Sequence, residues 1–219
     1  MAQNDPADIA ALTEVFKGPQ PEGRNTTIRF SNKGNLVVDT EAAKALAAAM
    51  SSNSWVEQVN FNGTGFGAAY EQILPALCDS KQIYSLNLGR GYLDNRHVIY
   101  LARAIEAKLP VRLDIVTVAD NALGEAGVEQ LVEAFNRLPA EPRKLLLANN
   151  VPCPLSERAV EALVKLRARA ADVVFGAGPA GRMLEARVAM AAIENDALKR
   201  QVNMKQAEVR ASDCLLALS

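Results

Sequence analysis

A short pattern of hydrophobic and polar positions returns six times along this chain. Each copy has an apolar residue, one spacer and a second apolar residue, as in Leu86-Asn87-Leu88, and such alternation is typical of a strand with one buried face. A turn follows, and then apolar residues at three- and four-residue steps, which predict an amphipathic helix. The six apolar pairs are Ile28/Phe30, Val59/Phe61, Leu86/Leu88, Val116/Val118, Leu145/Leu147 and Val173/Phe175.

The copies recur about every 29 residues, counted from Ile28 to Val173. A unit of that length with one strand and one helix is typical of the long leucine-rich repeat, in which neighbouring units stack into a solenoid. We therefore predict an α/β fold, a right-handed leucine-rich-repeat solenoid of about five to six strand–helix repeats with helical caps at both ends. The solenoid is predicted to span residues 26–178.

Two of the predicted helices have features of their own. In the first unit the helix is expected over Glu41–Met50 with Thr40 as its N-cap, and its packing side is mostly alanine, which suits a tightly stacked solenoid. In the second unit Pro75 falls within the helical pattern, where it costs a hydrogen bond outside the first turn. We expect a late helix start or a kink there.

The two ends of the stack should differ from the repeats, because an open stack exposes its core. Residues 1–25 are predicted to form a capping helix and a linker, with Asp5 and Pro6 as favoured helix-start residues. Residues 179–219 are predicted to form a long C-terminal capping helix and a tail. The stripe of this helix that is expected to close the stack is Leu184, Val188, Ala191, Leu198 and Val202.

Two surfaces allow more than one interpretation. On the concave face, Ile115, Leu146 and Val174 either lie under the tail 215–218 or form a partner patch. The last helix carries a second, weaker apolar stripe interleaved with basic residues, so it is either clamped by its own domain or binds a partner. That second stripe consists of Met190, Ile193, Ala197 and Met204.

Charge and composition exclude several classes of protein. The 219 residues carry 24 Lys and Arg against 25 Asp and Glu, a net charge of −1, which argues against a nucleic-acid or anionic-membrane surface. No apolar run reaches the length of about 18 residues that a membrane span needs, and the start does not resemble a secretory signal. Three scattered cysteines indicate reduced thiols in the cytoplasm. The single histidine, His97, is expected to be structural, and a zinc site is nearly excluded.

A glycine motif suggests a different function but lacks its context. Gly176-Ala177-Gly178-Pro179-Ala180-Gly181 follows a predicted strand and precedes a helix, as in dinucleotide sites. Such sites also need a second strand ending in an acidic residue about 20 residues on, where this chain continues as helix. The glycines occupy the turn found in every unit, so dinucleotide binding through Gly176–Gly181 is a remote alternative. Because no other catalytic or metal-ligand spacing occurs, we expect no enzyme, no cofactor and no metal.

Two segments carry a resemblance to a known family. One is the helix Ala42–Ala47 running into Asn53–Phe61, and the other is Phe175-Gly176 with Gly181-Arg182 and then Arg187–Arg200. On these residues the chain resembles the carboxy-terminal leucine-rich-repeat domain of tropomodulins and leiomodins, over most of residues 26–203. The resemblance implies a cytoplasmic, cytoskeletal protein that binds actin and regulates the pointed ends of filaments.

In that family the contacts to actin come from loops along one edge of the solenoid and from the terminal helix. By position, the resemblance implies contacts from Arg182, Arg187, Asn195, Lys199 and Arg200 in the helix, and from the turn residues Asn32, Lys33, Arg90, Asp120 and Asn149. Tropomyosin binding is not carried over, because only a short helix precedes the repeats here. The alternative is a general repeat scaffold with a non-actin partner on the concave face.

Overall fold

The strands form one parallel sheet whose order follows the chain. The computed structural model describes residues 7–21, 25–80, 82–107, 113–138, 144–148, 150, 155–169 and 172–216, with side chains up to Glu208 and at Arg210. Each strand pairs with the next in the same register, so that equivalent residues of neighbouring units lie side by side. The six strands, in sheet order, are β1 (Thr27–Arg29), β3 (Gln58–Asn60), β5 (Ser85–Asn87), β6 (Ile115–Thr117), β7 (Lys144–Leu146) and β8 (Asp172–Val174).

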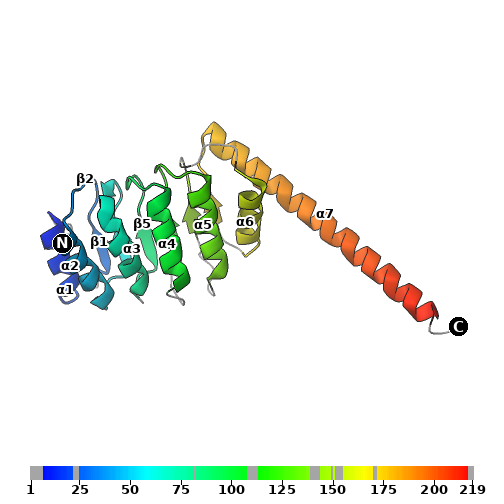
Figure 1. The fold of residues 1–219 in the computed structure, drawn as a ribbon, viewed down its shortest axis with the longest axis horizontal. Helices are drawn as coiled ribbons and strands as arrows, with labels where there is room; N and C mark the ends of the chain where they lie inside the picture. The colour runs from blue at the N-terminus through cyan, green and yellow to red at the C-terminus, as the bar shows by residue number, and fades with distance from the viewer. Residues whose placement is uncertain are drawn as a thin grey trace.

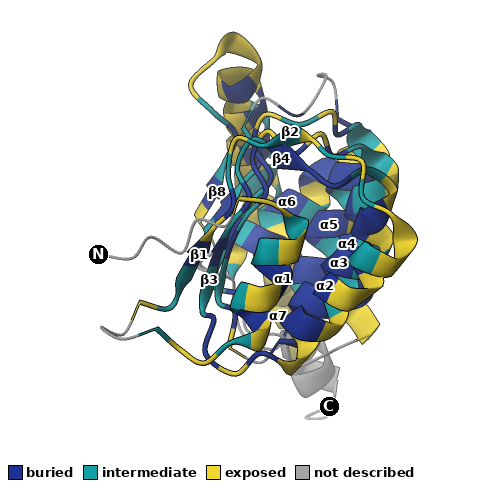
Figure 2. Ribbon diagram, turned by 90° about the vertical axis from the view of Figure 1, so that its left-hand side faces the viewer, coloured by how far each residue is buried: buried dark blue, intermediate teal, exposed yellow. Residues whose placement is uncertain are grey.

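A helix follows every strand, and the helices cover one face of the sheet (Figure 2). No element of the described residues covers the other face, which we call the open sheet face, and the predicted solenoid of strand–helix repeats is confirmed. Two short strands, β2 (Gly34–Asn35) and β4 (Thr64–Gly65), pair along the turn edge, and a 3-10 turn, Gly67–Ala69, precedes α3. The helices are α1 (Ile9–Lys17), α2 (Thr40–Ser52), α3 (Tyr70–Asp79), α4 (Asn95–Ala107), α5 (Glu125–Arg137), α6 (Glu157–Ala168) and α7 (Pro179–Leu216).

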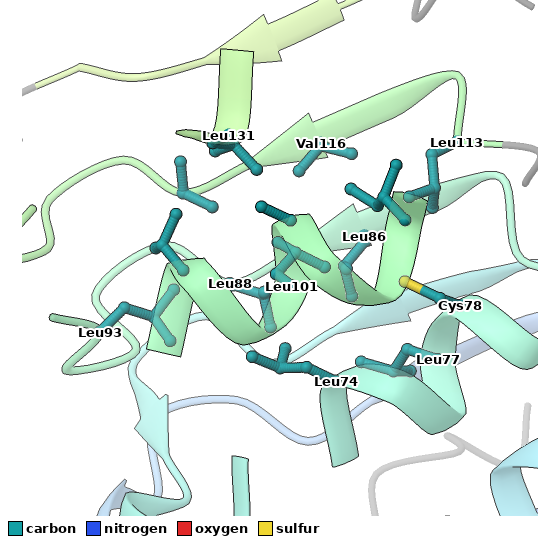
Figure 3. Close-up of a cluster of buried hydrophobic side chains, with 14 of the residues drawn as sticks. Leu74, Leu77, Cys78, Leu86, Leu88, Leu93, Leu101, Leu113, Val116 and Leu131 are labelled. Carbon is teal, nitrogen blue, oxygen red and sulfur yellow. The ribbon is translucent and has the colours of Figure 1, made fainter. Parts of the chain in front are cut away.

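The core lies between the sheet and the helices. Both apolar residues of all six sequence pairs are buried, because alternate residues of a strand point to the same face. In the third unit Leu86 and Leu88 meet Leu101 of α4, with Leu74 and Leu77 of α3 in the same cluster (Figure 3). Each unit thus buries its neighbour's apolar surface, which is what stabilises a solenoid.

An asparagine side chain joins neighbouring turns. The Asn121 side-chain amide donates to the carbonyl oxygens of Val118 at 2.7 Å and Leu88 at 3.0 Å, and its Oδ1 accepts from the Leu93 backbone N–H at 3.0 Å. One unit further on, Asn150 Oδ1 accepts from the Asn121 N–H at 2.8 Å. These bonds satisfy backbone groups that a turn leaves without partners inside the protein.

The structure corrects the two helix starts predicted near the N-terminus. Asp39, not Thr40, is the N-cap of α2, since its extended backbone lets the carboxylate accept from Ala42 N–H at 2.9 Å, and the helix runs to Ser52. Asp8 caps α1 in the same way, accepting from Ala11 N–H at 2.8 Å. Asp5 and Pro6, the predicted start, lie outside the described residues.

The helix that contains Pro75 starts earlier than one of the two expected alternatives. The helix α3 begins at Tyr70, five residues ahead of it, so the predicted late start is wrong and Pro75 lies inside the helix. Its ring nitrogen has no hydrogen to donate to the carbonyl of Glu71. The burial of Ile73, Leu74 and Leu77 holds this helix against the core despite the missing bond.

The long C-terminal helix closes the stack with its first turns only. It starts at Pro179, where the sequence predicts it, and Leu184 and Val188 are 3% and 1% exposed. Leu198 and Val202 are 58% and 52% exposed, so the expectation that the whole stripe closes the stack is wrong. The reason is length: α6 has 12 residues and α7 has 38, so α7 extends beyond the solenoid (Figure 1).

The open sheet face is not covered by this helix. The backbone of α7 carries Leu215 and Leu216 away from the strands (Figure 1), which rules out a role for them as a lid over Ile115, Leu146 and Val174. Ala217 and Leu218, the rest of the predicted covering tail, lie outside the described residues.

His97 has a structural role at the start of α4. Its Nδ1 accepts from the Asp94 N–H at 3.1 Å, and its own N–H donates to Asp94 Oδ1 at 3.2 Å, which forms a reciprocal cap. The ring lies 5.1 Å from that of Tyr70. Burial lowers the pKa of His97, an effect that the nearby Asp94 carboxylate opposes only in part and that Arg96 reinforces.

The lowered pKa of His97 predicts that stability depends on pH. Below the ordinary histidine pKa of about 6.5, the unfolded chain binds a proton that the folded protein resists, so stability falls as the pH falls from about 6.5 toward the folded pKa. We expect the urea midpoint of unfolding to be lower at pH 5 than at pH 7. A His97→Gln variant keeps the cap but cannot titrate, so its urea midpoint should fall less between pH 7 and pH 5. An equal fall in the variant would assign the pH dependence to other groups.

Candidate functional site

Four side chains are held on the turn edge by an uncommon backbone conformation. Asn32, Arg90, Tyr92 and Asp120 have φ values of 58°, 53°, 58° and 56°, in the left-handed region that residues with side chains seldom adopt. Such a conformation costs on the order of 1 kcal/mol or more at each position. Backbone bonds to the next unit hold it, from Asn32 N to Asn62 O at 2.7 Å and from Asp120 N to Ala148 O at 2.8 Å.

These side chains line a common groove, which we call the turn groove. Its volume is about 610 Å³, and it contains three of the residues that the resemblance implies, Asn32, Arg90 and Asp120. Arg90 Nε lies 3.7 Å from Asp120 Oδ2, and both side chains are partly exposed. The lining residues are Asn32, Gly34, Gly63, Arg90, Tyr92, Asp120, Asn121 and Ala122. The repeat therefore brings together turn residues that lie about 30 positions apart in the sequence.

Tyr92 is a member of this groove that the sequence analysis did not single out. It is 58% exposed, and its ring covers Gly65, where an added Cβ would meet Tyr92 Cδ2 at 2.9 Å. The sequence signal that could have identified it is a tyrosine placed between Gly91 of the turn and the inward-pointing Leu93. An exposed tyrosine beside an arginine is a composition typical of protein interfaces.

The remaining turn candidates differ in their surroundings. Lys33 places its ammonium 5.4 Å from the Phe30 ring centroid, and its backbone N–H donates to Thr64 Oγ1 at 3.1 Å. Its charge is therefore held over an aromatic ring at the end of the turn edge. Asn149, the last turn candidate, lies outside the described residues.

Two of the helix candidates hold the structure together. Arg187 is half-buried, and its guanidinium donates to the Leu155 carbonyl, which fixes α7 to the segment before α6. Arg187 also lies near Glu125, whose pKa is lowered first by hydrogen bonding to Ser156 and further by this positive charge. Arg182 donates to the carbonyl of Ala177 in the turn that opens α7. These contacts make Arg187 and Arg182 parts of the helix attachment.

The other helix candidates lie further along α7. Asn195 and Lys199 line a cleft of about 720 Å³ between α6 and α7, with Lys199 Nζ 3.8 Å from Asp196 Oδ1. Arg200 is exposed. The floor of this α6–α7 cleft is apolar and its rim carries both signs of charge, from Glu161, Lys165, Arg167, Asp196 and Lys199. Such a surface suits a protein segment with an apolar side.

The open sheet face offers a small apolar patch. Leu146 and Val174 are register partners on β7 and β8, and Ile115 on β6 pairs with Lys144, two residues before Leu146 on the same face. All three are half-buried. A non-actin partner on this face stays a prediction.

The glycine motif performs a packing role. Gly176 has φ 94°, which turns the chain after β8. An added Cβ at Gly181 would meet the Gly176 carbonyl oxygen, and the Phe175 carbonyl oxygen at 2.7 Å, so this glycine lets the helix approach the strand. The strand order never reverses, and dinucleotide sites form where it does. The topology therefore does not support the dinucleotide alternative.

The part of the chain that the structure describes shows neither a metal-ligand cluster nor a membrane-spanning helix. No group of three or more His, Cys, Asp or Glu side chains is placed to hold a metal there. In the same part, no helix combines the length and the apolar character that crossing a membrane requires.

No protein-family model and no curated protein sequence matches this chain. Two of the solved structures to which it is similar are leiomodin-1 actin-binding site 2 and the C-terminal domain of Caenorhabditis elegans tropomodulin. The first is 14% identical, with 92% of this chain and 99% of that one covered and a TM-score of 0.46. The second is also 14% identical, with 90% and 99% covered and a TM-score of 0.49. Both come from the group of proteins that the sequence resembles.

Proposed function

We propose that this protein binds actin through its turn groove and α7, and that it acts at the pointed ends of filaments. The observation that carries the proposal is the position of the segment that holds the resemblance. Residues 187–200 begin against the solenoid, at Arg187 and Val188, and continue away from it along α7, so that Lys199 and Arg200 are exposed rather than folded into the core. A basic stretch on a projecting helix is complementary to an acidic partner such as actin.

The turn groove supports the same proposal independently of the helix. Asn32, Arg90, Tyr92 and Asp120 are exposed, and backbone hydrogen bonds to the next unit hold Asn32, Arg90 and Asp120. A backbone that is held in advance loses little freedom on binding, which favours affinity. The exposed Tyr92 ring and the Arg90 guanidinium are the groups most suited to anchor a protein partner.

One experiment separates actin binding from action at the pointed end. Elongation of pyrene-labelled actin is followed from seeds whose barbed ends are capped, and binding to filaments is measured by cosedimentation in parallel. We expect micromolar protein to bind filaments and to slow elongation. Binding without slowing would contradict the pointed-end role alone, and absence of both would contradict the proposed function.

Charge reversal tests the two surfaces separately. Arg90→Glu changes the turn groove and Lys199→Glu changes α7, and each should weaken filament binding by about tenfold, because each replaces an attraction by a repulsion. Lys44→Glu on α2 is the matched control, since its side chain is 60% exposed and lies outside both surfaces. Unchanged affinity of either test variant would remove that surface from the site.

A further inference from the structure

A stripe of mostly apolar residues, interrupted by Arg200, runs along the outer side of α7. Its members fall into two series of residues that are seven apart, and its four large side chains, Met183, Met190, Ile193 and Met204, are 58–65% exposed. Side chains of this size ordinarily contribute to a buried interface. We call it the outer stripe; it consists of Met183, Ala186, Met190, Ile193, Ala197, Arg200, Met204 and Ala207.

The outer stripe faces away from the solenoid. At 3.6 residues per turn, its members lie about half a turn from Leu184 and Val188, the α7 residues buried in the core. A second helix can therefore approach the outer stripe along its whole length without displacing α6. Residues 183–207 extend for about 37 Å, past the end of the solenoid (Figure 1).

The seven-residue spacing identifies the kind of partner. Apolar residues at the first and fourth positions of successive heptads form the seam of a coiled coil, and about three heptads are enough to sustain one. Alanines between the large residues let two helices approach closely. We propose that the outer stripe pairs with the outer stripe of a second copy of this chain, so that two copies form a dimer through α7. This dimer does not depend on actin binding.

The charges beside the stripe favour antiparallel helices. In a parallel pair, Arg200 would lie against Arg200 of the second copy, and Arg182 would lie beside its Arg187. An antiparallel pair with Ile193 opposite Met204 of the second copy removes both repulsions. In that register Arg187 lies on the same flank as Glu208 of the second copy, and Glu194 on the same flank as its Gln201. Charge complementarity therefore selects one orientation.

The antiparallel register also fits side-chain size. Met190 lies opposite Ala207 of the second copy, a large residue against a small one. Arg200 lies opposite Ala197, and its long side chain can cover that alanine while the guanidinium reaches water. In this arrangement the two solenoids lie toward opposite ends of the helix pair.

Sedimentation equilibrium tests the dimer. We expect the full chain at micromolar to hundred-micromolar concentration to approach twice the 23.5 kDa of one copy. Ile193→Glu should raise the dissociation constant at least tenfold, whereas Leu198→Glu, an equally drastic change at a 58% exposed position on another side of α7, should alter it less than twofold. A monomer at every concentration overturns the proposal, and so does equal loss in the two variants.

Disulfide cross-linking tests the orientation. Cys153→Ser and Cys214→Ser provide the background, in which Cys78 is buried. Mixing an Ile193→Cys chain with a Met204→Cys chain should give mainly the mixed dimer under mild oxidation. Two copies of residue 193 lie about 16 Å apart in this register, too far for a disulfide. Dominant linkage of Ile193→Cys to itself overturns the antiparallel pairing.

Discussion

Replacing Asn121 with leucine is expected to lower the free energy of unfolding by about 3 kcal/mol. The substitution removes the acceptor of the Leu93 N–H and the donor to the carbonyls of Leu88 and Val118. These groups belong to the turns of two neighbouring units, and each buried polar group left without a partner costs about 1–3 kcal/mol. Leucine has the same number of side-chain heavy atoms in the same branched arrangement, so the substitution opens no cavity and removes the hydrogen bonds.

Urea unfolding followed by circular dichroism measures this loss. Asn203→Leu on the exposed part of α7 is the control, because it removes an asparagine that lies in solvent. The control should stay within about 0.5 kcal/mol of the parent protein. If Asn121→Leu loses less than 1 kcal/mol, water replaces the side chain, and the joining of the turns contributes little to stability.

Replacing Gly181 with alanine is expected to destabilise the protein by about 2–4 kcal/mol. The added methyl group meets two backbone carbonyl oxygens, those of Phe175 and Gly176. These oxygens cannot move out of the way unless β8 or α7 shifts as a whole. At an unobstructed helical position the same change is stabilising, since alanine favours a helix over glycine by about 1 kcal/mol. The expected sign is therefore the reverse of the intrinsic helical preference.

Gly178→Ala is a matched control three residues earlier. An added Cβ there has no atom within 4 Å, so its unfolding free energy should stay within about 0.5 kcal/mol of the parent value. Chemical unfolding of both variants, with no nucleotide added, makes the comparison. If the unfolding free energy of Gly181→Ala equals that of the parent, the close approach of α7 to β8 is not needed for stability. The packing role assigned to these glycines would then be wrong.

The order of strands and helices was predictable because it depends on local alternation. Every predicted apolar pair is buried, since the two-residue period of a strand places both members of a pair on the same face of the sheet. The N-cap of α2 was one residue off, because Asp39 and Thr40 are both good caps and only the backbone angles distinguish them. The start of α3 was predicted too late, because tertiary burial outweighs the one hydrogen bond that Pro75 removes from the helix.

The candidate site was predictable only in part. The repeat brought Asn32, Arg90 and Asp120 together, as the equivalence of turns implies, but the exposed ring of Tyr92 beside them depends on the backbone at Gly65. The resemblance named Arg187 and Arg182 by position. Their hydrogen bonds to the carbonyls of Leu155 and Ala177 could not be foreseen, since these depend on how α7 meets the solenoid.

The sequence by itself determined the repeat, the six strands and the place where the last helix starts, because these follow from the periods of apolar residues along the chain. Only the tertiary structure decided how much of that helix is buried. Leu184 and Leu198 belong to the same stripe in sequence, but α6 is long enough to cover the first and too short to reach the second. Burial depends on the length of the neighbouring element, and no pattern within a single helix records that length.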